Sequence, residues 1–567
     1  MITPDPDQDR VLATEGRHVL VVAPPGTGKT FCAVRLAAHV ARGLADHQRV
    51  LVLTFSNQAR AELHREARRL VSSMLVAKIE IRNYHQLFRE KLWAYRAALG
   101  LHADLELISE RERLGALRAR FGGRIGQRQA HIWSEILEHT IPAFREAQSP
   151  PLELANTAAE VVSEQNRGGL MAFGDLGYYF WQLLERFPVL ERAARAAYPV
   201  VIADEHQDAS ALQDAIVRRF SAEGRLIMFA DDLQLIHGWR GADERRLARH
   251  REEADEVIEL RTSHRWAEAR ALGTWLLRVR DRFLGRDDAP AGDPPEGVEV
   301  VRYPTRHHRY RQAFPYIAGA AARAFDAGCG AVAVMCPWNR HASELRDYLT
   351  RRGMYPRQLG GPADFDFARD LQVRLPVAAD GRVRAGLALD VLEDLVPQLD
   401  ANVRRQLRAR VELAGPNLVR AGELTRALLE TMRPLWAGDA PGPFFAVVSR
   451  LVEVVEAAGY HVPRTECLGP IRQAARDRAE AIAAYQKWVA AARFSASAKM
   501  PHGLLVMTVH QAKGKEFDAV IVTFVDPEAF PENLDGRRLL YVAMTRARRR
   551  LTLIAPEVHP SRLLALL

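Results

Sequence analysis

Residues 19–30, with the sequence VLVVAPPGTGKT, constrain the fold of this chain more than any other segment. Val19 to Val22 is a short β-branched run suited to a buried strand, and the prolines and glycines after it cannot continue that strand. A helical pattern follows from Phe31 to Arg42. Strand, glycine-rich loop and helix in this order form a P-loop, whose backbone N–H groups and helix N-terminus favour a phosphate. We therefore predict a nucleotide site at this turn of an α/β fold.

The residues of the loop have distinct expected roles. Lys29 can reach the β- and γ-phosphates of a nucleotide, and the Thr30 hydroxyl can bind Mg²⁺. The rest of the phosphate-binding turn is Ala23, Pro24, Pro25, Gly26, Thr27 and Gly28. A strand, turn and helix without a ligand is the alternative. Lysine is rare in this chain, with seven among 567 residues, so a chance match is improbable, on the order of one per cent.

A second candidate segment, at residues 200–208, has the sequence VVIADEHQD. Its apolar run predicts a strand, and Asp204 and Glu205 follow at the carboxyl end of that strand. Asp204 can hold the Mg²⁺ ion that Thr30 also touches, and Glu205 can polarise the water that attacks the γ-phosphate. Many surface turns also carry an Asp–Glu pair, so the P-loop upstream is what makes this segment a candidate for catalysis.

A third junction between a strand and a loop, at residues 228–242, has the sequence MFADDLQLIHGWRGA. Gln234 is a candidate sensor of the γ-phosphate. Trp239 and Arg240 lie among polar and glycine residues, which favours a surface on which nucleic-acid bases stack. A core tryptophan is the alternative for Trp239.

Strand-like runs recur in two sets with helical patterns between them, which is typical of parallel α/β sheets. The first set lies at residues 49–54, 200–204, 226–230 and 257–260, and the second at residues 297–302, 331–336, 504–509, 519–525 and 551–555. A linker rich in Pro, Gly and Asp separates the sets at residues 286–297. Strand signals vanish between residues 84 and 198, and a second mostly helical stretch covers residues 360–500. We predict two α/β domains, each with a mainly helical insertion.

The charge of the chain favours a nucleic-acid partner. The formal net charge is +9 and the pI is near 9.5, although many cytosolic proteins share such a pI. The four cysteines form no C-x-x-C pair and no tight cluster, so we expect no zinc or iron–sulfur site and a reducing cytosol. No run of about 18 apolar residues predicts a membrane span. The acidic N-terminus does not have the pattern of a signal peptide.

Further segments complete an ordered series of motifs. Gln8 lies 21 residues before Lys29, and the other segments are LTFSNQARAEL (53–63), NYHQLF (83–88), RTSHRW (261–266), MTVHQAKGKEFDAVIV (507–522) and RRLLYVAMTRARRRL (537–551). Together with the P-loop, DEHQD and ADDLQLIHGWRGA, they resemble the motifs of superfamily 1A DNA helicases of the UvrD/Rep/PcrA type. The matches run from residue 8 to residue 551, and only the helical insertions fall outside them.

The resemblance implies a role for each matching residue. The residues implied in phosphoryl chemistry are Lys29, Thr30, Asp204, Glu205 and Gln234. Arg265 and Arg546 would reach across the ATP site and neutralise charge on the transferring phosphoryl group. Gln8 would read adenine, His264 would occupy the position that stacks on adenine, and Glu516 would touch the ribose. The residues implied in single-stranded DNA binding are Phe55, Asn57, His85, Trp239, Arg240 and His510.

The sequence departs from the family pattern at several positions. Histidine replaces an aromatic residue at three of them, which are His206, His237 and His264. Gln58 replaces a lysine, and Leu233 and Leu235 replace Asp and Ser. None of these changes removes a group that binds phosphate or Mg²⁺, so we expect ATP hydrolysis to survive.

The resemblance also implies a domain plan. Two RecA-like domains, 1A and 2A, would each carry an insertion, 1B and 2B. Their boundaries would be 1–84 and 195–280 for 1A, 85–194 for 1B, 281–360 and 502–567 for 2A, and 361–501 for a reduced 2B. Within 2B, apolar residues from Leu392 to Val411 are spaced for one helix face, which Pro397 could kink. Arginines 404, 405, 408 and 410 there could bind duplex phosphate, or could line a solvated helix face.

The function that the resemblance implies is an ATP- and Mg²⁺-dependent DNA helicase. It would move along single-stranded DNA in the 3′→5′ direction and act at junctions with duplex, in DNA repair, replication or antiviral defence. We expect a cytoplasmic, nucleoid-associated protein of a prokaryote. Since the chain ends at Leu567, shortly after Arg546, we expect no C-terminal nuclease, and any cutting of DNA would need a partner.

Two alternatives remain open. The first is a DNA-stimulated ATPase that remodels DNA–protein complexes, or regulates a partner nuclease or another repair or defence protein, without processive unwinding. The second is a P-loop kinase or nucleotide sensor whose ATP turnover would not respond to DNA.

Overall fold

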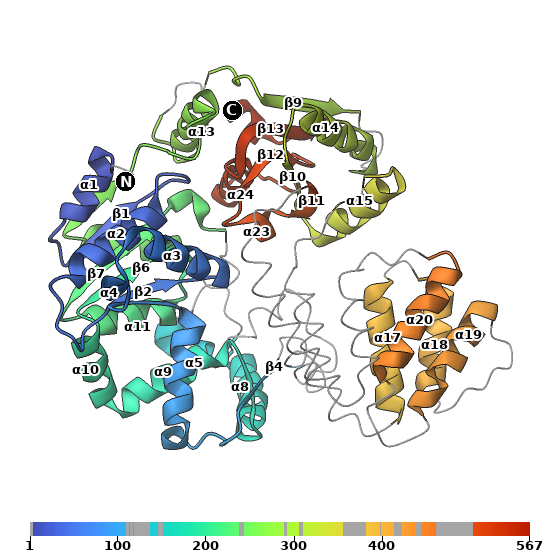
Figure 1. Cartoon of the computed structure of the whole chain (residues 1–567), viewed down its shortest axis with the longest axis horizontal. Helices are drawn as coiled ribbons and strands as arrows, with labels where there is room; N and C mark the ends of the chain where they lie inside the picture. The colour runs from blue at the N-terminus through green and yellow to red at the C-terminus, as the bar shows by residue number, and fades with distance from the viewer. Residues whose placement is uncertain are drawn as a thin grey trace. The chain divides into compact units, whose positions relative to one another are not determined.

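A computed structural model of the chain describes residues 4–108, 113, 117, 136–145, 151–236, 243–287, 292–304, 310–354, 356, 381–396, 399–412, 422–436, 444–460 and 503–567. The chain divides into two compact units, one formed by residues 1–359 and 501–567 and the other by residues 360–500. The larger unit contains parallel sheets, and the described part of the smaller unit is helical (Figure 1).

The first large sheet has six parallel strands in the order β3-β2-β6-β7-β1-β8. Its strands are β1 (His18–Val22), β2 (Val50–Thr54), β3 (Ile79–Asn83), β6 (Val200–Ala203), β7 (Arg225–Ala230) and β8 (Glu256–Glu259). The helices around it are α1 (Pro6–Ala13), α2 (Lys29–Ala41), α3 (Asn57–Leu70), α4 (Ser73–Val76), α5 (Tyr84–Tyr95), α9 (Asp175–Arg186), α10 (Pro188–Ala197), α11 (Ala211–Ser221) and α12 (Glu244–Glu253). Because the strands are parallel, their carboxyl ends meet at one edge, where ligands of open α/β sheets bind.

Both faces of this sheet are buried beneath helices. In β1, Val19 and Val21 pack in a cluster with the apolar side chains of α2, whereas Leu20 and Val22 pack with those of α5, α9 and α11. A strand covered on both sides needs apolar residues at every position. The continuous apolar runs in the sequence are therefore explained by two layers of helices.

The segment between β3 and β6 is mainly helical, with α8 (Leu152–Arg167) in addition to α5, α9 and α10. It also contains two short strands, β4 (Glu106–Ile108) and β5 (Leu170–Ala172), which pair in parallel. The segment is mainly helical, as predicted, but no signal in the sequence indicated these two strands. Strands of three residues are too short to produce a periodic signal.

The second large sheet has five parallel strands in the order β11-β10-β12-β13-β9. Its strands are β9 (Val298–Tyr303), β10 (Ala331–Cys336), β11 (Gly503–Thr508), β12 (Phe517–Val522) and β13 (Ala547–Pro556). The helices that accompany it are α13 (Arg270–Phe283), α14 (Phe314–Asp326), α15 (Asn339–Arg351), α23 (Val509–Ala512) and α24 (Leu534–Met544). Alternate residues of β10 face two different clusters, so this sheet too is covered on both sides.

Helix α13 packs with the second sheet although it directly follows the elements of the first. Its residues Leu272, Trp275 and Leu276 belong to the same cluster as apolar residues of β10, β11 and α24. Figure 1 shows α13 beside the C-terminal end of the chain. The predicted domain boundary at residue 280 remains a prediction, but the packing joins α13 to the second sheet.

In the smaller unit, four helices share one apolar cluster. These helices are α17 (Gly381–Leu395), α18 (Ala401–Glu412), α19 (Glu423–Met432) and α20 (Phe444–Ala457). The prediction of one helix face from Leu392 to Val411 is wrong, because that stretch belongs to two helices. Helix α17 ends at Leu395, and a proline at position 397 lacks the N–H that a continuing helix needs and disfavours helical geometry at the preceding residue.

Two parallel sheets with helices on both faces confirm the predicted α/β class. Strand β3 was not predicted, because only Ile79 and Ile81 are apolar in a strand that lies at the edge of its sheet. None of the helices in the described part of the chain combines the length and hydropathy that a membrane span requires.

Candidate nucleotide and DNA sites

The P-loop connects β1 to α2 and needs its glycines for steric reasons. Gly26 has φ of +79° and Gly28 has φ of +85°, in the left-handed region that favours glycine. A Cβ atom on Gly26 would lie 2.5 Å from the Cβ atom of Arg265, and one on Gly28 would lie 2.6 Å from Nε2 of Gln8. The Thr27 hydroxyl donates to the Pro24 carbonyl at 2.8 Å. The loop therefore lies between two of the predicted ATP-site residues.

The predicted adenine-site residues lie beside this loop. The Gln8 side chain is 3% exposed and donates from Nε2 to the Thr27 carbonyl at 3.0 Å. Nε2 of His264 lies 2.8 Å from a carboxylate oxygen of Asp5, the residue that caps α1. The backbone N–H of His264 donates to the carbonyl of Gly26 at 2.7 Å. The geometry brings these residues together, and their contact with adenine remains a prediction.

Lys29 and Glu205 form an ion pair at the carboxyl edge of the first sheet. Lys29 Nζ lies 2.6 Å from Glu205 Oε1, and Gln207 donates to the other Glu205 oxygen at 2.5 Å. Burial alone would raise the pKa of Glu205, but the nearby Lys29 and Lys513 lower it, so the carboxylate is ionised. Lys29 and Glu205 therefore compensate each other's charge. By the resemblance, this is the position expected for the γ-phosphate and the attacking water.

Asp204 lies at the end of β6 with its carboxylate almost fully buried. Thr54 donates a hydrogen bond to it at 3.3 Å. Burial and then the adjacent Glu205 raise the pKa of Asp204, so a cation beside it would relieve an unfavourable buried charge. Carboxylate and hydroxyl oxygens are the ligands that Mg²⁺ prefers. Asp204, with Thr30 in the first turn of α2, is therefore a chemically suitable pair for this ion.

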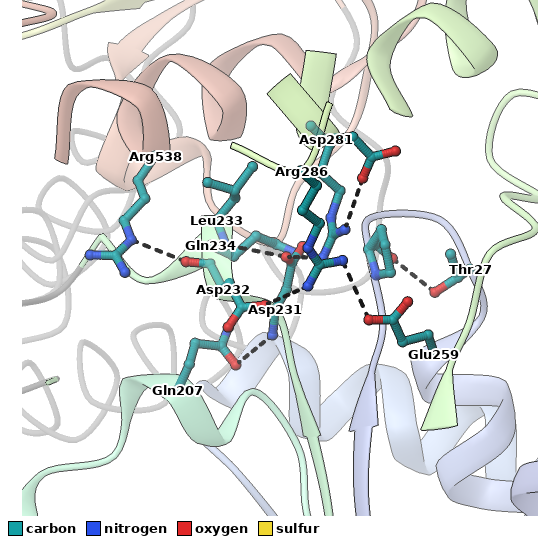
Figure 2. A network of polar contacts seen from close by, with 12 residues as sticks. Thr27, Gln207, Asp231, Asp232, Leu233, Gln234, Glu259, Asp281, Arg286 and Arg538 are labelled. Atoms are coloured by element: carbon teal, nitrogen blue, oxygen red, sulfur yellow. Dashed lines mark hydrogen bonds and ion pairs between the residues drawn. The ribbon is translucent and has the colours of Figure 1, made fainter. Parts of the chain in front are cut away.

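Gln234 lies in a polar network at the end of β7, which Figure 2 shows. It donates from Nε2 to Asp231 at 2.9 Å, and the Asp231 backbone N–H donates to the Gln207 side chain at 3.3 Å. Gln207 in turn contacts Glu205. The predicted sensor and the predicted base are thus joined through two intervening residues, Asp231 and Gln207.

Both predicted arginines reach this region from elsewhere in the chain. Arg265 forms an ion pair with Glu516 at 2.6 Å and donates to the Thr545 carbonyl at 2.6 Å. Arg546, which is 2% exposed, donates to the Gln234 side chain at 3.4 Å. Burial, and next the nearby Arg265, lower the pKa of Arg546 to about 10. An anion at this place would compensate two close guanidinium groups.

Two residues to which the sequence assigned no role, Lys513 and Arg538, make contacts between the two sheets. Lys513 Nζ lies 2.5 Å from a carboxylate oxygen of Asp208 and 2.6 Å from the Gln234 carbonyl. Arg538 donates to the Asp232 carbonyl at 3.0 Å (Figure 2). Lys513 lies inside a recognised motif of a chain in which lysine is rare, and these two features could have marked it as a candidate site residue.

The predicted DNA contacts of the first sheet follow neighbouring strands. Phe55 and Asn57 follow β2, and His85 follows β3. The ring of Phe55 lies 4.8 Å from that of Tyr84, and the ring of His85 lies 6.0 Å edge-on from that of Phe173. Phe173 is 43% exposed and was not predicted. An exposed aromatic beside a motif histidine extends the candidate stacking surface.

Other predicted residues lie elsewhere. His510 is in α23, directly after β11 of the second sheet. Trp239, Arg240 and His237 lie outside the described residues, as does the side chain of Gln58. Leu233 and Leu235, which replace polar residues of the family, are buried. Of the arginines in the smaller unit, Arg408 pairs with Asp390 and Glu393, which leaves its charge compensated.

The fold and the site define a P-loop ATPase with two parallel-sheet domains. Residues 5–255 match the UvrD/REP helicase N-terminal domain and residues 503–554 match the UvrD-like helicase C-terminal domain, just over half of the chain together. The chain belongs to the UvrD family of superfamily 1A DNA helicases, which are ATP-hydrolysing enzymes. Helicases of this type use ATP, generally with Mg²⁺.

Relatives match nearly the whole chain. The DNA helicase II of Haemophilus influenzae is 24% identical over 624 residues, covering 98% of this chain and 84% of that protein. The ATP-dependent DNA helicase UvrD1 of Mycobacterium tuberculosis is 24% identical, covering 96% and 81%. The DNA helicase II of Escherichia coli is 23% identical, covering 97% and 84%.

Proposed function

We propose that this chain is a motor that hydrolyses ATP to move along single-stranded DNA in the 3′→5′ direction and separates strands at junctions with duplex. The observation that carries the proposal is the contact between the two sheets at the ATP site. Arg546, from the second sheet, reaches Gln234, which is linked through Asp231 and Gln207 to Glu205. A nucleotide bound there would touch both sheets, so hydrolysis could change how they contact each other.

In the proposed reaction, the P-loop amides and Lys29 hold the phosphates, and Gln8, His264 and Glu516 hold the adenosine. When Lys29 pairs with phosphate, Glu205 is released from the 2.6 Å ion pair and can accept the proton of the attacking water. Arg265 and Arg546 supply positive charge to the transferring group. Mg²⁺, held by Thr30 and Asp204, would supply further charge compensation to the phosphate oxygens.

In the proposed DNA track, bases stack on aromatic side chains at the carboxyl edges of both sheets. Phe55, Asn57 and His85 would form the part on the first sheet, and His510 would form the part on the second. Trp239 and Arg240 are proposed to complete it. Stacking tolerates every base and contributes roughly 1–3 kcal/mol per base, which suits a motor that must move over any sequence.

The proposed domain plan keeps the predicted boundaries. Domain 1A would comprise residues 1–84 and 195–280, with 85–194 as insertion 1B. Domain 2A would comprise residues 281–360 and 502–567, with 361–501 as insertion 2B. The compact unit of residues 360–500 supports the last division. The proposed setting is the cytoplasm of a prokaryote, in repair, replication or defence.

The test uses the full chain on duplexes that carry a 3′ tail, a 5′ tail or no tail. We expect DNA to stimulate ATP hydrolysis and only the 3′-tailed duplex to be unwound. Stimulated hydrolysis that displaces streptavidin from biotinylated single strands, without unwinding, would favour the remodelling ATPase. Hydrolysis at one rate with and without DNA would contradict both and favour the kinase or sensor.

A further inference from the structure

His206, which replaces an aromatic residue of the family pattern, lies in a buried chain of hydrogen bonds. Its Nε2 atom lies 3.0 Å from Asp214 Oδ1, and its Nδ1 atom lies 3.2 Å from the Tyr84 hydroxyl. The same oxygen of Asp214 lies 2.7 Å from Nε2 of His250. All four residues are at most 6% exposed, so water does not compete for these contacts.

Each polar atom in this series of hydrogen bonds can be assigned as a donor or an acceptor without conflict. The Asp214 carboxylate only accepts, so His206 donates from Nε2, and its Nδ1 atom accepts the proton of the Tyr84 hydroxyl. His250 also donates to Asp214, and Nε of Arg218 lies 3.3 Å from the second carboxylate oxygen. The ligand atoms of His206, Asp214 and His250 are close enough to surround a metal ion. The guanidinium already compensates the carboxylate, which favours hydrogen bonds over a bound cation.

One end of this series of hydrogen bonds, at His206, lies beside the predicted general base. Glu205, which precedes His206, has φ of +52° and ψ of +37°. Residues other than glycine rarely adopt this conformation, so the surrounding structure must hold it. The ring of His206 is held on both sides, by Tyr84 and by Asp214, and so holds the backbone beside Glu205.

The other end of this series of hydrogen bonds, at Tyr84, lies beside the predicted DNA surface. Tyr84 is the first residue of α5, and its neighbour in the chain is His85. The ring of Phe55 lies 4.8 Å from the ring of Tyr84. Phe55 and His85 are both proposed to contact single-stranded DNA. Tyr84 therefore lies between two proposed DNA contacts and His206.

We infer that Tyr84 and His206 are positioning residues that couple DNA binding to the general base Glu205. The inference rests on the proposed function, and it adds a route for the stimulation of hydrolysis by DNA. A nucleobase that stacks on Phe55 would shift the neighbouring ring of Tyr84. Through its hydrogen bond to His206, Tyr84 would then shift His206 and the backbone of Glu205.

Such coupling requires an element with two arrangements, and we propose that Glu205 is that element. In one arrangement its oxygens are bound by Lys29 and Gln207, as observed. In the other, Lys29 would bind phosphate and Glu205 would face water. The hydrogen bond between Tyr84 and His206 would bias the second arrangement when DNA is present.

The test compares Tyr84→Phe with a matched control, Tyr198→Phe, in the full chain. Tyr198 is also buried in the first sheet domain, and its hydroxyl donates to Glu80 at 3.0 Å, away from the chain of His206. We expect Tyr84→Phe to keep its hydrolysis rate without DNA and its affinity for oligothymidylate. Its kcat in the presence of DNA should fall about five- to tenfold. Tyr198→Phe should keep full stimulation.

A double-mutant cycle with His206→Phe sharpens the result. If both residues act through one hydrogen bond, the double variant should be stimulated no less than His206→Phe alone. Losses of stimulation that multiply in the double variant would overturn the inference. So would full stimulation of Tyr84→Phe, or equal losses with and without DNA. One zinc ion per purified chain, removed by His206→Phe, would also overturn it.

The failure of the proposed function would look different. In that case the unmodified chain itself would show no stimulation by DNA, and no variant could lose it. Stimulation of the unmodified chain that survives in Tyr84→Phe contradicts only the coupling route.

Discussion

At the scale of single residues, the charged side chains of the predicted ATP site are paired with one another. The predicted base Glu205 is bound to Lys29 and Gln207, and Arg265 is bound to Glu516. Charged groups gathered for a polyanionic substrate need partners when that substrate is absent, because an uncompensated buried charge is costly. The ion pairs are therefore what we expect of a site for a polyanionic substrate.

Glu205→Gln tests the assignment of the base. The variant keeps the shape of the side chain and the Mg²⁺ ligand Asp204, but glutamine cannot accept the proton of water. We expect kcat to fall at least about a hundredfold, with nucleotide and DNA affinity retained. Glu223→Gln, at an exposed ion pair with Arg195, should hydrolyse ATP normally. A Glu205→Gln rate within a few-fold of the unmodified chain would rule out this base.

His250 predicts how stability depends on pH. Burial, opposed by the hydrogen bond to Asp214, lowers the pKa of His250 below its usual value of about 6.5. Below that pH the unfolded chain binds a proton that the folded chain does not, so the free energy of unfolding decreases as pH falls. Between pH 7 and pH 5, His250→Gln should lose less stability than the unmodified chain, measured by denaturant titration. His47→Gln, in an exposed loop, should keep the slope, and an unchanged slope in His250→Gln would contradict the assignment.

At the scale of elements, most predicted site residues of the first sheet lie just after the end of a strand, whereas Gln8 lies in α1. The P-loop follows β1, Phe55 follows β2, His85 follows β3, and Asp204 and Gln234 follow β6 and β7. The junction of β5 and α9 adds Phe173 from within the helical insertion. Parallel strands gather these residues at one edge without needing them to be close in sequence.

Phe173→Ala tests whether this junction contributes to the DNA surface. We expect single-strand affinity to weaken by roughly 1–3 kcal/mol, the value of one stacked base. The melting temperature should change little, because the ring is 43% exposed. Leu170→Ala is the matched control, since Leu170 lies in β5, the strand directly before Phe173, and is 37% exposed. Unchanged affinity for oligothymidylate in Phe173→Ala would remove Phe173 from the DNA surface.

At the scale of the whole larger unit, a few polar contacts join the two sheets beside the ATP site. Lys513 contacts Asp208 and Gln234, Arg546 contacts Gln234, and Arg538 contacts Asp232. Lys513 and Asp208 are both largely buried. The stability of this arrangement therefore depends on charges that compensate each other across the two sheets.

Lys513→Met tests that dependence. The variant leaves the Asp208 carboxylate buried without its cation, which we expect to cost about 3–5 kcal/mol of the free energy of unfolding. The double variant with Asp208→Asn should recover much of this loss, since the buried charge is then gone. Lys515→Met is the control, because among the described residues the hydrogen bond of Lys515 Nζ goes to the Gln511 carbonyl in its own segment. Additive losses in the double variant, measured by denaturant unfolding, would show that the pair is not coupled.

Local sequence determined the P-loop, most strands of both sheets and the order of the motifs. These features are short, because a buried strand needs about five apolar residues and a phosphate loop needs a fixed turn. The roles of Gly26, Gly28 and Lys29 can be predicted from the dozen residues around them. The family, the α/β class and the helical character of the insertions followed from them.

Tertiary structure alone decided which distant residues meet. Tyr84 and His206 are 122 positions apart, and Lys513 and Asp208 are 305 apart. No periodicity links such pairs, because their contact depends on the strand order of a folded sheet and on how two sheets pack. The same holds for α13, whose apolar face fits either domain by pattern and is assigned to the second sheet only by its packing.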